Sequence, residues 1–121
     1  MTTNEVIVAV RRRDLTLIVH RSPTNGGIWH LVAGGVEADE TAEDGAARAL
    51  FEITQLKTSV RPLNFSFTHH GINVEAFVAD APAGWEPVLD SEHDKYIWCG
   101  RGHATKLLYW PEPRQIVELL R

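Results

Sequence analysis

The stretch Gly34–Leu56, GGVEADETAEDGAARALFEITQL, decides the fold of this 121-residue chain. Two glycines, which permit tight turns and close approaches of the backbone, lead into an acidic segment. Apolar residues then recur at helical spacing, at Ala47, Leu50, Phe51 and Thr54. The pattern predicts a loop followed by a helix over residues 44–54. We expect Leu50 and Phe51 to be buried beneath a sheet, and Glu52 to face a cleft.

The composition is that of an ordinary soluble globular protein, with 44% hydrophobic and 23% charged residues. The length predicts a single domain over residues 1–121. The net charge of −4 argues against binding to a nucleic-acid polymer, because such binding favours a basic surface. No apolar run approaches the roughly 20 residues that span a bilayer, so we expect no membrane insertion.

Two further features bear on the cellular compartment. Cys99 is the single cysteine, which excludes an internal disulfide and makes the cytoplasm the expected location. The first residues, MTTNEVIVAV, have no basic region before their apolar run, so we expect no secretory signal.

The remaining segments alternate between β-rich runs and turn signals. The last helix is expected to begin at a Trp-Pro pair, because proline is tolerated in a first helical turn. A mixed sheet covered by helices, an α/β fold, is therefore predicted. The expected strands are residues 6–10, 15–19, 28–35, 60–70, 72–81 and 95–99, and the expected further helices are residues 102–108 and 110–121.

The spacing of the charged residues in Gly34–Leu56 resembles a known motif. Glu40 follows Gly34 after five residues, and Arg48 follows Glu40 after seven. This is similar to the Nudix box, Gly-x5-Glu-x7-Arg-Glu-U-x-Glu-Glu-x-Gly-U, in which U is apolar. The segments SEHDKYIW (91–98) and LLYWPEPRQIVELL (107–120) most resemble the bacterial branch that cleaves dihydroneopterin triphosphate and dATP.

The resemblance covers nearly the whole chain and implies the Nudix fold, a mixed sheet sandwiched between helices. It also implies hydrolysis of a nucleoside diphosphate linked to another group. The expected cofactor is Mg2+ or Mn2+, a hard ion that prefers oxygen ligands. The expected partner is a small nucleotide-like diphosphate, and a homodimer is possible.

The resemblance assigns roles to individual residues. The expected catalytic residues are Glu52, Arg48 and Glu92, and the expected metal ligands are Glu52, Glu40 and Glu92. The expected substrate-binding residues are Gly34, Gly35, Glu37 and Trp85.

The chain departs from the motif where metal ligands are needed. Positions i, i+3 and i+4 of one helix share a face, and here they are Ala49, Glu52 and Ile53. Two of the three carboxylates are missing, so magnesium should bind weakly. The closing glycine of the motif is Gln55, so the end of the helix could also differ. Two hypotheses follow: a weak or divergent hydrolase, and a binding module that has lost efficient hydrolysis.

Simpler interpretations exist for several of these residues. Arg48 and Glu52 could form a surface pair worth about 0.3–0.5 kcal/mol, and Glu92 could equally be an ordinary loop carboxylate. His69 and His70 should point to opposite faces of a strand, which argues against a zinc site. The aromatic residues are expected in the core or at its rim, with Trp85 as the exception.

Overall fold

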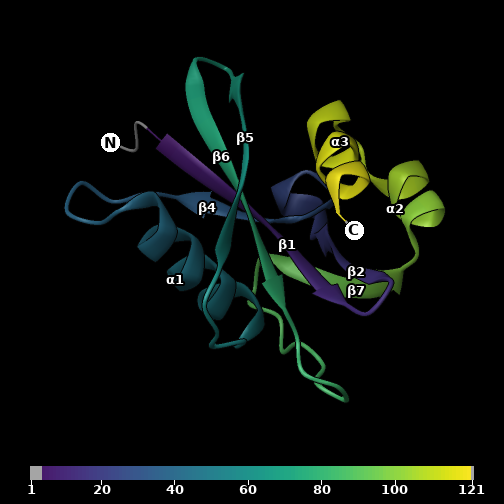
Figure 1. Ribbon diagram of the computed structural model, residues 1–121. Helices are drawn as coiled ribbons and strands as arrows, with labels where there is room; N and C mark the ends of the chain where they lie inside the picture. The colour runs from purple at the N-terminus through teal and green to yellow at the C-terminus, as the bar shows by residue number, and fades with distance from the viewer. Residues whose placement is uncertain (1–3, 121) are drawn as a thin grey trace.

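The computed structural model describes residues 4–120, and Figure 1 shows their arrangement. Seven strands and three α-helices follow one another in a mixed α/β order. The strands are β1 (Asn4–Arg12), β2 (Leu15–Arg21), β3 (Trp29–His30), β4 (Val32–Gly35), β5 (Arg61–His69), β6 (Ile72–Asp80) and β7 (His93–Cys99). The helices are α1 (Ala42–Thr54), α2 (Arg101–Leu107) and α3 (Pro111–Leu119), with a short 3-10 helix, η1, at Pro23–Asn25. None of the helices in residues 4–120 is long and apolar enough to cross a membrane.

The strand β1 lies at the centre of the sheet. It pairs in parallel with β6 and antiparallel with β2 and β4, while β5 pairs antiparallel with β6, and β7 with β2. The sheet is therefore mixed, as predicted. The predicted strand over residues 28–35 is divided in two at Leu31, because β3 pairs with β2 whereas β4 pairs with β1.

The two faces of the sheet carry separate cores. Alternate residues of a strand point to opposite faces, so Val8 packs on the side of α1 and Ile7 on the side of α2 and α3. Figure 1 shows α1 apart from α2 and α3, with the sheet between them. The sandwich of helices and sheet predicted from the sequence is confirmed.

The helix α1 begins at Ala42, two residues before the predicted start at Asp44. The Thr41 hydroxyl accepts a hydrogen bond from the Asp44 amide at 3.1 Å, which caps the first turn. Glu43 and Asp44 also lie in that turn, where negative charge favours the helix dipole.

The prediction that Phe51 is buried was wrong. Leu50 is fully buried, but Phe51 is 42% exposed. The buried face runs through Ala46, Ala49, Leu50 and Ile53, which is the predicted face turned by one residue. Small side chains allow this face to approach the sheet closely, because a Cβ on Gly34 would stand 2.9 Å from the Ala49 Cβ.

Two other local expectations are corrected. Gln55 adopts the left-handed conformation with φ 68° and donates its amide to the Phe51 carbonyl at 2.8 Å, so the helix ends as it would with glycine. His69 and His70 do not lie on opposite faces, since their ring centroids are 4.2 Å apart. His70 has φ 50° and starts the turn to β6, where the alternation of a strand no longer holds.

Candidate ligand-binding site

Arg48 joins the glycine turn, the acidic loop and α1. Its Nη2 donates to the Gly35 carbonyl at 2.8 Å and to Glu40 Oε1 at 2.6 Å, and its Nε lies 3.2 Å from each Glu40 oxygen. Its Nη1 donates to Glu52 Oε1 at 3.0 Å, and Glu37 Oε1 is 4.0 Å from Nη2. The structure thus gathers five of the residues that the sequence singled out.

Glu40 is held as an anion by these contacts. Its side chain is 16% exposed and also accepts the Glu37 amide at 3.0 Å. The hydrogen bonds from Arg48, and then the one from the Glu37 amide, lower the pKa of the Glu40 carboxyl. The same pairing raises the pKa of Arg48. The arrangement fastens residues 35–40 to the first turns of α1.

The side chains of α1 do not fit a magnesium site built from several carboxylates. Ala49 is 3% exposed and Ile53 is 7% exposed, so both positions expected to carry ligands are apolar and buried. The Glu40 carboxylate is already bonded to Arg48 on both oxygens. In residues 4–120, no group of three or more His, Cys, Asp or Glu side chains is placed to hold a metal ion.

Glu92 and Trp85 lie in the loop between β6 and β7. Glu92 is exposed, and its carbonyl accepts the Ser22 amide at 2.9 Å. Trp85 packs against the core on the α1 side and meets Trp98 edge-on, with ring centroids 6.3 Å apart. Neither residue lines the cavity described below, and the roles assigned to them stay predictions.

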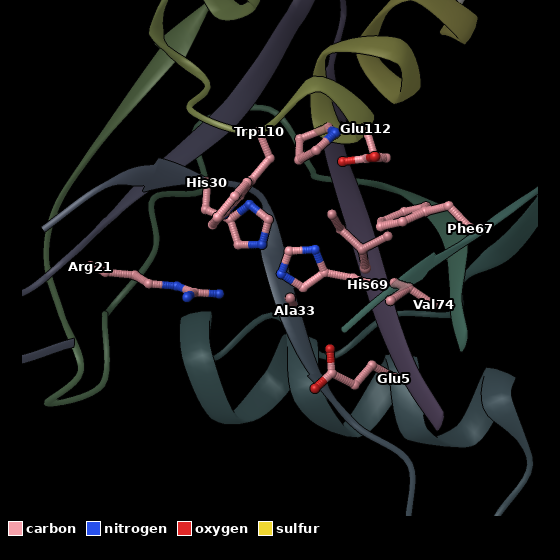
Figure 2. A pocket seen from close by; sticks show the side chains of 11 residues that line it. Glu5, Arg21, His30, Ala33, Phe67, His69, Val74, Trp110 and Glu112 are labelled. Carbon is pink, nitrogen blue, oxygen red and sulfur yellow. The ribbon is translucent and has the colours of Figure 1, made fainter. Parts of the chain in front are cut away.

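A cavity of about 200 Å³ lies on the other face of the sheet, between the strands and the start of α3. Figure 2 shows the rings of His30, His69 and Trp110 at its centre, with Arg21 reaching in beside them. Its wall is completed by Glu5, Ile7, Ala33, Phe67, Val74, Glu112 and Pro113.

An irregularity in β2 accompanies the placement of Arg21 in this cavity. The pairing of β2 with β7 shifts register between His20 and Arg21, and such a bulge re-aims the side chains that follow it. Val19 packs in the core on the α1 side. Two residues later, Arg21 lines the cavity on the opposite face.

His30 is a buried and neutral side chain of the cavity. It is 8% exposed, and its Nδ1 is buried without a hydrogen-bond partner among the described residues. Burial lowers the pKa of His30 to about 3, with smaller contributions from Arg21, His93 and His69. A buried polar atom without a partner costs about 1–3 kcal/mol.

The strand β4 connects the cavity to the Arg48 cluster. Ala33 lines the cavity, Gly34 lies against Ala49, and Gly35 accepts the hydrogen bond from Arg48. Three consecutive residues therefore link both features, so that a ligand reaching from the cavity past β4 would approach the glycine turn.

Sequence reasoning did not identify the charged and imidazole side chains of this cavity, which are Glu5, Arg21, His30, His69 and Glu112. They come from five elements and share no local motif. The Trp-Pro pair at the start of α3 was the one available signal, since Trp110 forms part of the wall.

Comparison with known proteins identifies the family. Residues 1–120 match the NUDIX domain family. The NAD-capped RNA hydrolase NudC of Edwardsiella ictaluri is 37% identical over 83 residues, which are 65% of this chain and 32% of that protein. The chain thus spans about a third of the length of this relative.

Solved structures show the same fold. The dihydroneopterin triphosphate pyrophosphohydrolase of E. coli superposes with a TM-score of 0.81 at 21% identity, covering 96% of this chain and 92% of that one. The NUDIX domain of Shewanella oneidensis NrtR, in a complex with ADP ribose, has a TM-score of 0.77 at 16% identity, covering 98% and 86%. The chain therefore belongs to the NUDIX domain family.

Proposed function

We propose that this chain binds a small nucleotide-like diphosphate and hydrolyses it poorly. The ligand would lie in the cavity of Figure 2, with its phosphates directed past β4 towards the glycine turn and Arg48. The observation that carries the proposal is the contrast between the two sides of β4. The cavity keeps cationic, polar and aromatic side chains, whereas α1 has lost two of the three carboxylates of the motif and keeps only Glu52.

The cavity supplies groups suited to such a ligand. Arg21 is half-buried and its side chain makes no hydrogen bond or ion pair with another described residue, so its guanidinium is available to a phosphate. Trp110 and His69 meet edge-on, with ring centroids 4.9 Å apart, and offer an aromatic surface to a base. The NUDIX domain of NrtR, which has the same fold, binds ADP ribose, a nucleotide-like diphosphate.

The poor hydrolysis follows from Ala49 and Ile53. The family generally uses divalent metals such as Mg2+ to hydrolyse its substrates, and carboxylates supply the hard oxygen ligands that these ions need. A methyl group and a branched alkyl group cannot supply them. Both positions are also buried in the hydrophobic core.

The second candidate is slow, metal-dependent hydrolysis of the same ligand. It is favoured by the retained cluster of Glu40, Arg48 and Glu52, because Glu52 is 60% exposed at its side chain and remains accessible. In this second candidate, Glu92 would add a catalytic and metal-binding carboxylate, and Glu37 would contact the substrate. A cytoplasmic location, a ligand other than a nucleic-acid polymer, and a homodimer also remain proposals.

Two measurements on the same preparation test these candidates. Calorimetry in EDTA measures binding of ADP ribose, nucleoside diphosphates and dinucleoside tetraphosphates, and phosphate release is then measured with Mg2+ or Mn2+. We expect binding in the micromolar range without metal, together with hydrolysis close to background. Metal-dependent hydrolysis that is abolished in Glu52→Gln would favour the second candidate.

A matched pair of variants locates the binding. Arg21→Gln should weaken binding about tenfold or more, because a hydrogen bond between charged groups is lost. Arg13→Gln removes the same charge from the exposed tip between β1 and β2 and should leave binding unchanged. Equal affinity in both variants would place the ligand elsewhere.

A further inference from the structure

The cavity of Figure 2 contains an unusual set of unpaired polar side chains. Glu5, Arg21 and Glu112 are half-buried and make no side-chain hydrogen bond or ion pair with other residues in 4–120. His30 is buried with an unpartnered Nδ1. A charge withdrawn from water is stabilised by a partner, so these partly buried side chains suit polar groups that a ligand would bring.

Charged side chains elsewhere in the molecule show the contrast. Arg12 donates to the Trp85 carbonyl at 2.6 Å and to Glu86 at 3.1 Å, and its guanidinium lies 4.1 Å from the centre of the Trp98 ring. Glu86 accepts two further hydrogen bonds, from the Tyr96 hydroxyl and the Trp98 indole. Arg12 and Glu86 are thus both paired by hydrogen bonds within the protein, whereas the side chains of Glu5, Arg21 and Glu112 in the cavity are not.

The charges of the cavity lie at separate ends of it. Figure 2 shows Glu112 at the α3 end, near Trp110 and Phe67, whereas Glu5 lies at the opposite end. Glu5 is paired with Gly35 in the sheet and is therefore next to the glycine turn. Phe67 lies at the end that carries Glu112, and the rings of Trp110 and His69, against which a base would lie, are at the centre of the cavity.

We propose that Glu112 selects the base of the ligand, favouring a base edge with N–H donors over an edge with carbonyl oxygens. The inference rests on the proposed function, in which the cavity holds the base and the phosphates extend past β4. It adds the chemical class of the base, an amino-substituted heterocycle, and names the residue that recognises it.

The chemistry of the carboxylate supports this selection. An ionised carboxylate only accepts hydrogen bonds, and it can accept two parallel N–H groups at once. Guanine presents a ring N–H beside an exocyclic amino group. Hypoxanthine lacks that amino group, so one carboxylate oxygen would stay unpaired in a half-buried site, and an unpaired polar group rejects the wrong ligand strongly.

His30 complements the carboxylate near the centre of the cavity. A neutral imidazole has one N–H donor and one acceptor nitrogen, and the low pKa of His30 keeps the ring in this form near neutral pH. It can therefore pair with a base without adding a second charge beside Arg21. The carboxylate decides which base edge is bound, and His30 adds one neutral hydrogen bond.

Guanosine and inosine diphosphates provide the test, because they differ only in the amino group. Their dissociation constants are measured by calorimetry in EDTA for the unmodified chain, for Glu112→Gln and for Glu118→Gln. Glu118 is an exposed residue of the same helix, so its variant is matched in charge. Glu112 also lies in the first turn of α3, where it favours the helix, so unfolding midpoints are recorded for each protein.

The unmodified chain and Glu118→Gln should bind guanosine diphosphate about tenfold more tightly than inosine diphosphate, the expected effect of one charge-assisted hydrogen bond. In Glu112→Gln the ratio should fall close to one. Equal affinities in the unmodified chain, or a ratio kept in Glu112→Gln, would overturn the selection by Glu112 while leaving nucleotide binding intact. If neither nucleotide binds and ADP ribose also fails to bind, the proposed function itself is wrong.

Discussion

The Cβ of Ala49 lies 2.9 Å from the position that a Cβ on Gly34 would occupy. Gly34 does not have a positive φ, so its backbone conformation would accept other residues. Glycine is required here because a larger side chain would collide with α1. The strand that borders the cavity is therefore seated directly on the helix that carries Arg48 and Glu52.

This contact predicts a coupled pair of substitutions. Gly34→Ala should destabilise the fold by about 1–3 kcal/mol, because the added methyl overpacks the contact. Ala49→Gly alone should cost about 1 kcal/mol for glycine within a helix. In the double variant the clash is absent, so urea unfolding should show a smaller loss than the sum of the single losses. If the two single losses simply add in the double variant, α1 can move away from Gly34 without an energetic cost.

The end of α1 predicts a stabilising substitution. Gln55 has φ 68°, and a side chain in this region costs about 1–2 kcal/mol relative to ordinary helical conformation. Gln55→Gly should raise the free energy of unfolding by about 1 kcal/mol, less the added entropy of glycine in the unfolded chain. Thr54→Gly, one residue earlier within the helix, should destabilise. A lower unfolding midpoint for Gln55→Gly than for the unmodified chain would contradict the proposed backbone strain at Gln55.

Restoring the missing carboxylates tests the loss of the metal site. Ala49→Glu with Ile53→Glu should destabilise the metal-free protein, because Ile53 packs in the core and an unpaired buried carboxylate is costly. Mg2+ should restore part of the thermal midpoint, since a bound ion stabilises the folded state. Hydrolysis of the best ligand should rise by roughly two orders of magnitude.

The control places the charge on the same helix outside the core. Phe51→Glu is suitable because Phe51 is 42% exposed. It should show neither the response to Mg2+ nor the gain in hydrolysis. A folded double variant that binds Mg2+ and still hydrolyses nothing would indicate that the cavity serves binding alone.

His30 predicts how stability depends on pH. The pKa of His30 is about 3 in the folded state and 6.5 in the unfolded chain, so between these values the unfolded chain binds the extra proton. The free energy of unfolding therefore falls as the pH drops below 6.5, because the unfolded chain gains a proton that folded His30 does not bind. From pH 7.5 to pH 5 the loss should be about 2 kcal/mol.

The variant His30→Phe isolates this effect. It removes the titrating group and the unpartnered Nδ1, so the difference in unfolding free energy between the two proteins should grow by about 2 kcal/mol at pH 5. Near neutral pH the variant should be as stable as the original chain or more stable, while ligand binding weakens. A difference that does not change with pH would show that the pKa of His30 is the same in the folded and unfolded states.

Much of the fold was predictable because its determinants are local. The acidic first turn favours the start of α1, and the uninterrupted apolar run over residues 6–10 of β1 is typical of a strand buried on both faces. The burial of Phe51 could not be predicted, because helical spacing defines a face but not its rotation. That rotation depends on how closely Ala49 approaches Gly34 on another element.

The sequence by itself determined the Nudix spacing, the chain's place in the family and the loss of carboxylates at Ala49 and Ile53, since these depend only on residue identity and separation. Only the tertiary structure decided that Arg48 binds Glu40 and Glu52 together, and that Arg21, His30 and Glu112 meet in one cavity. The physical reason is that these side chains come from different elements. Their meeting depends on the pairing of β2 with β3 and with β7, the bulge after His20 and the packing of α3, which no local pattern specifies.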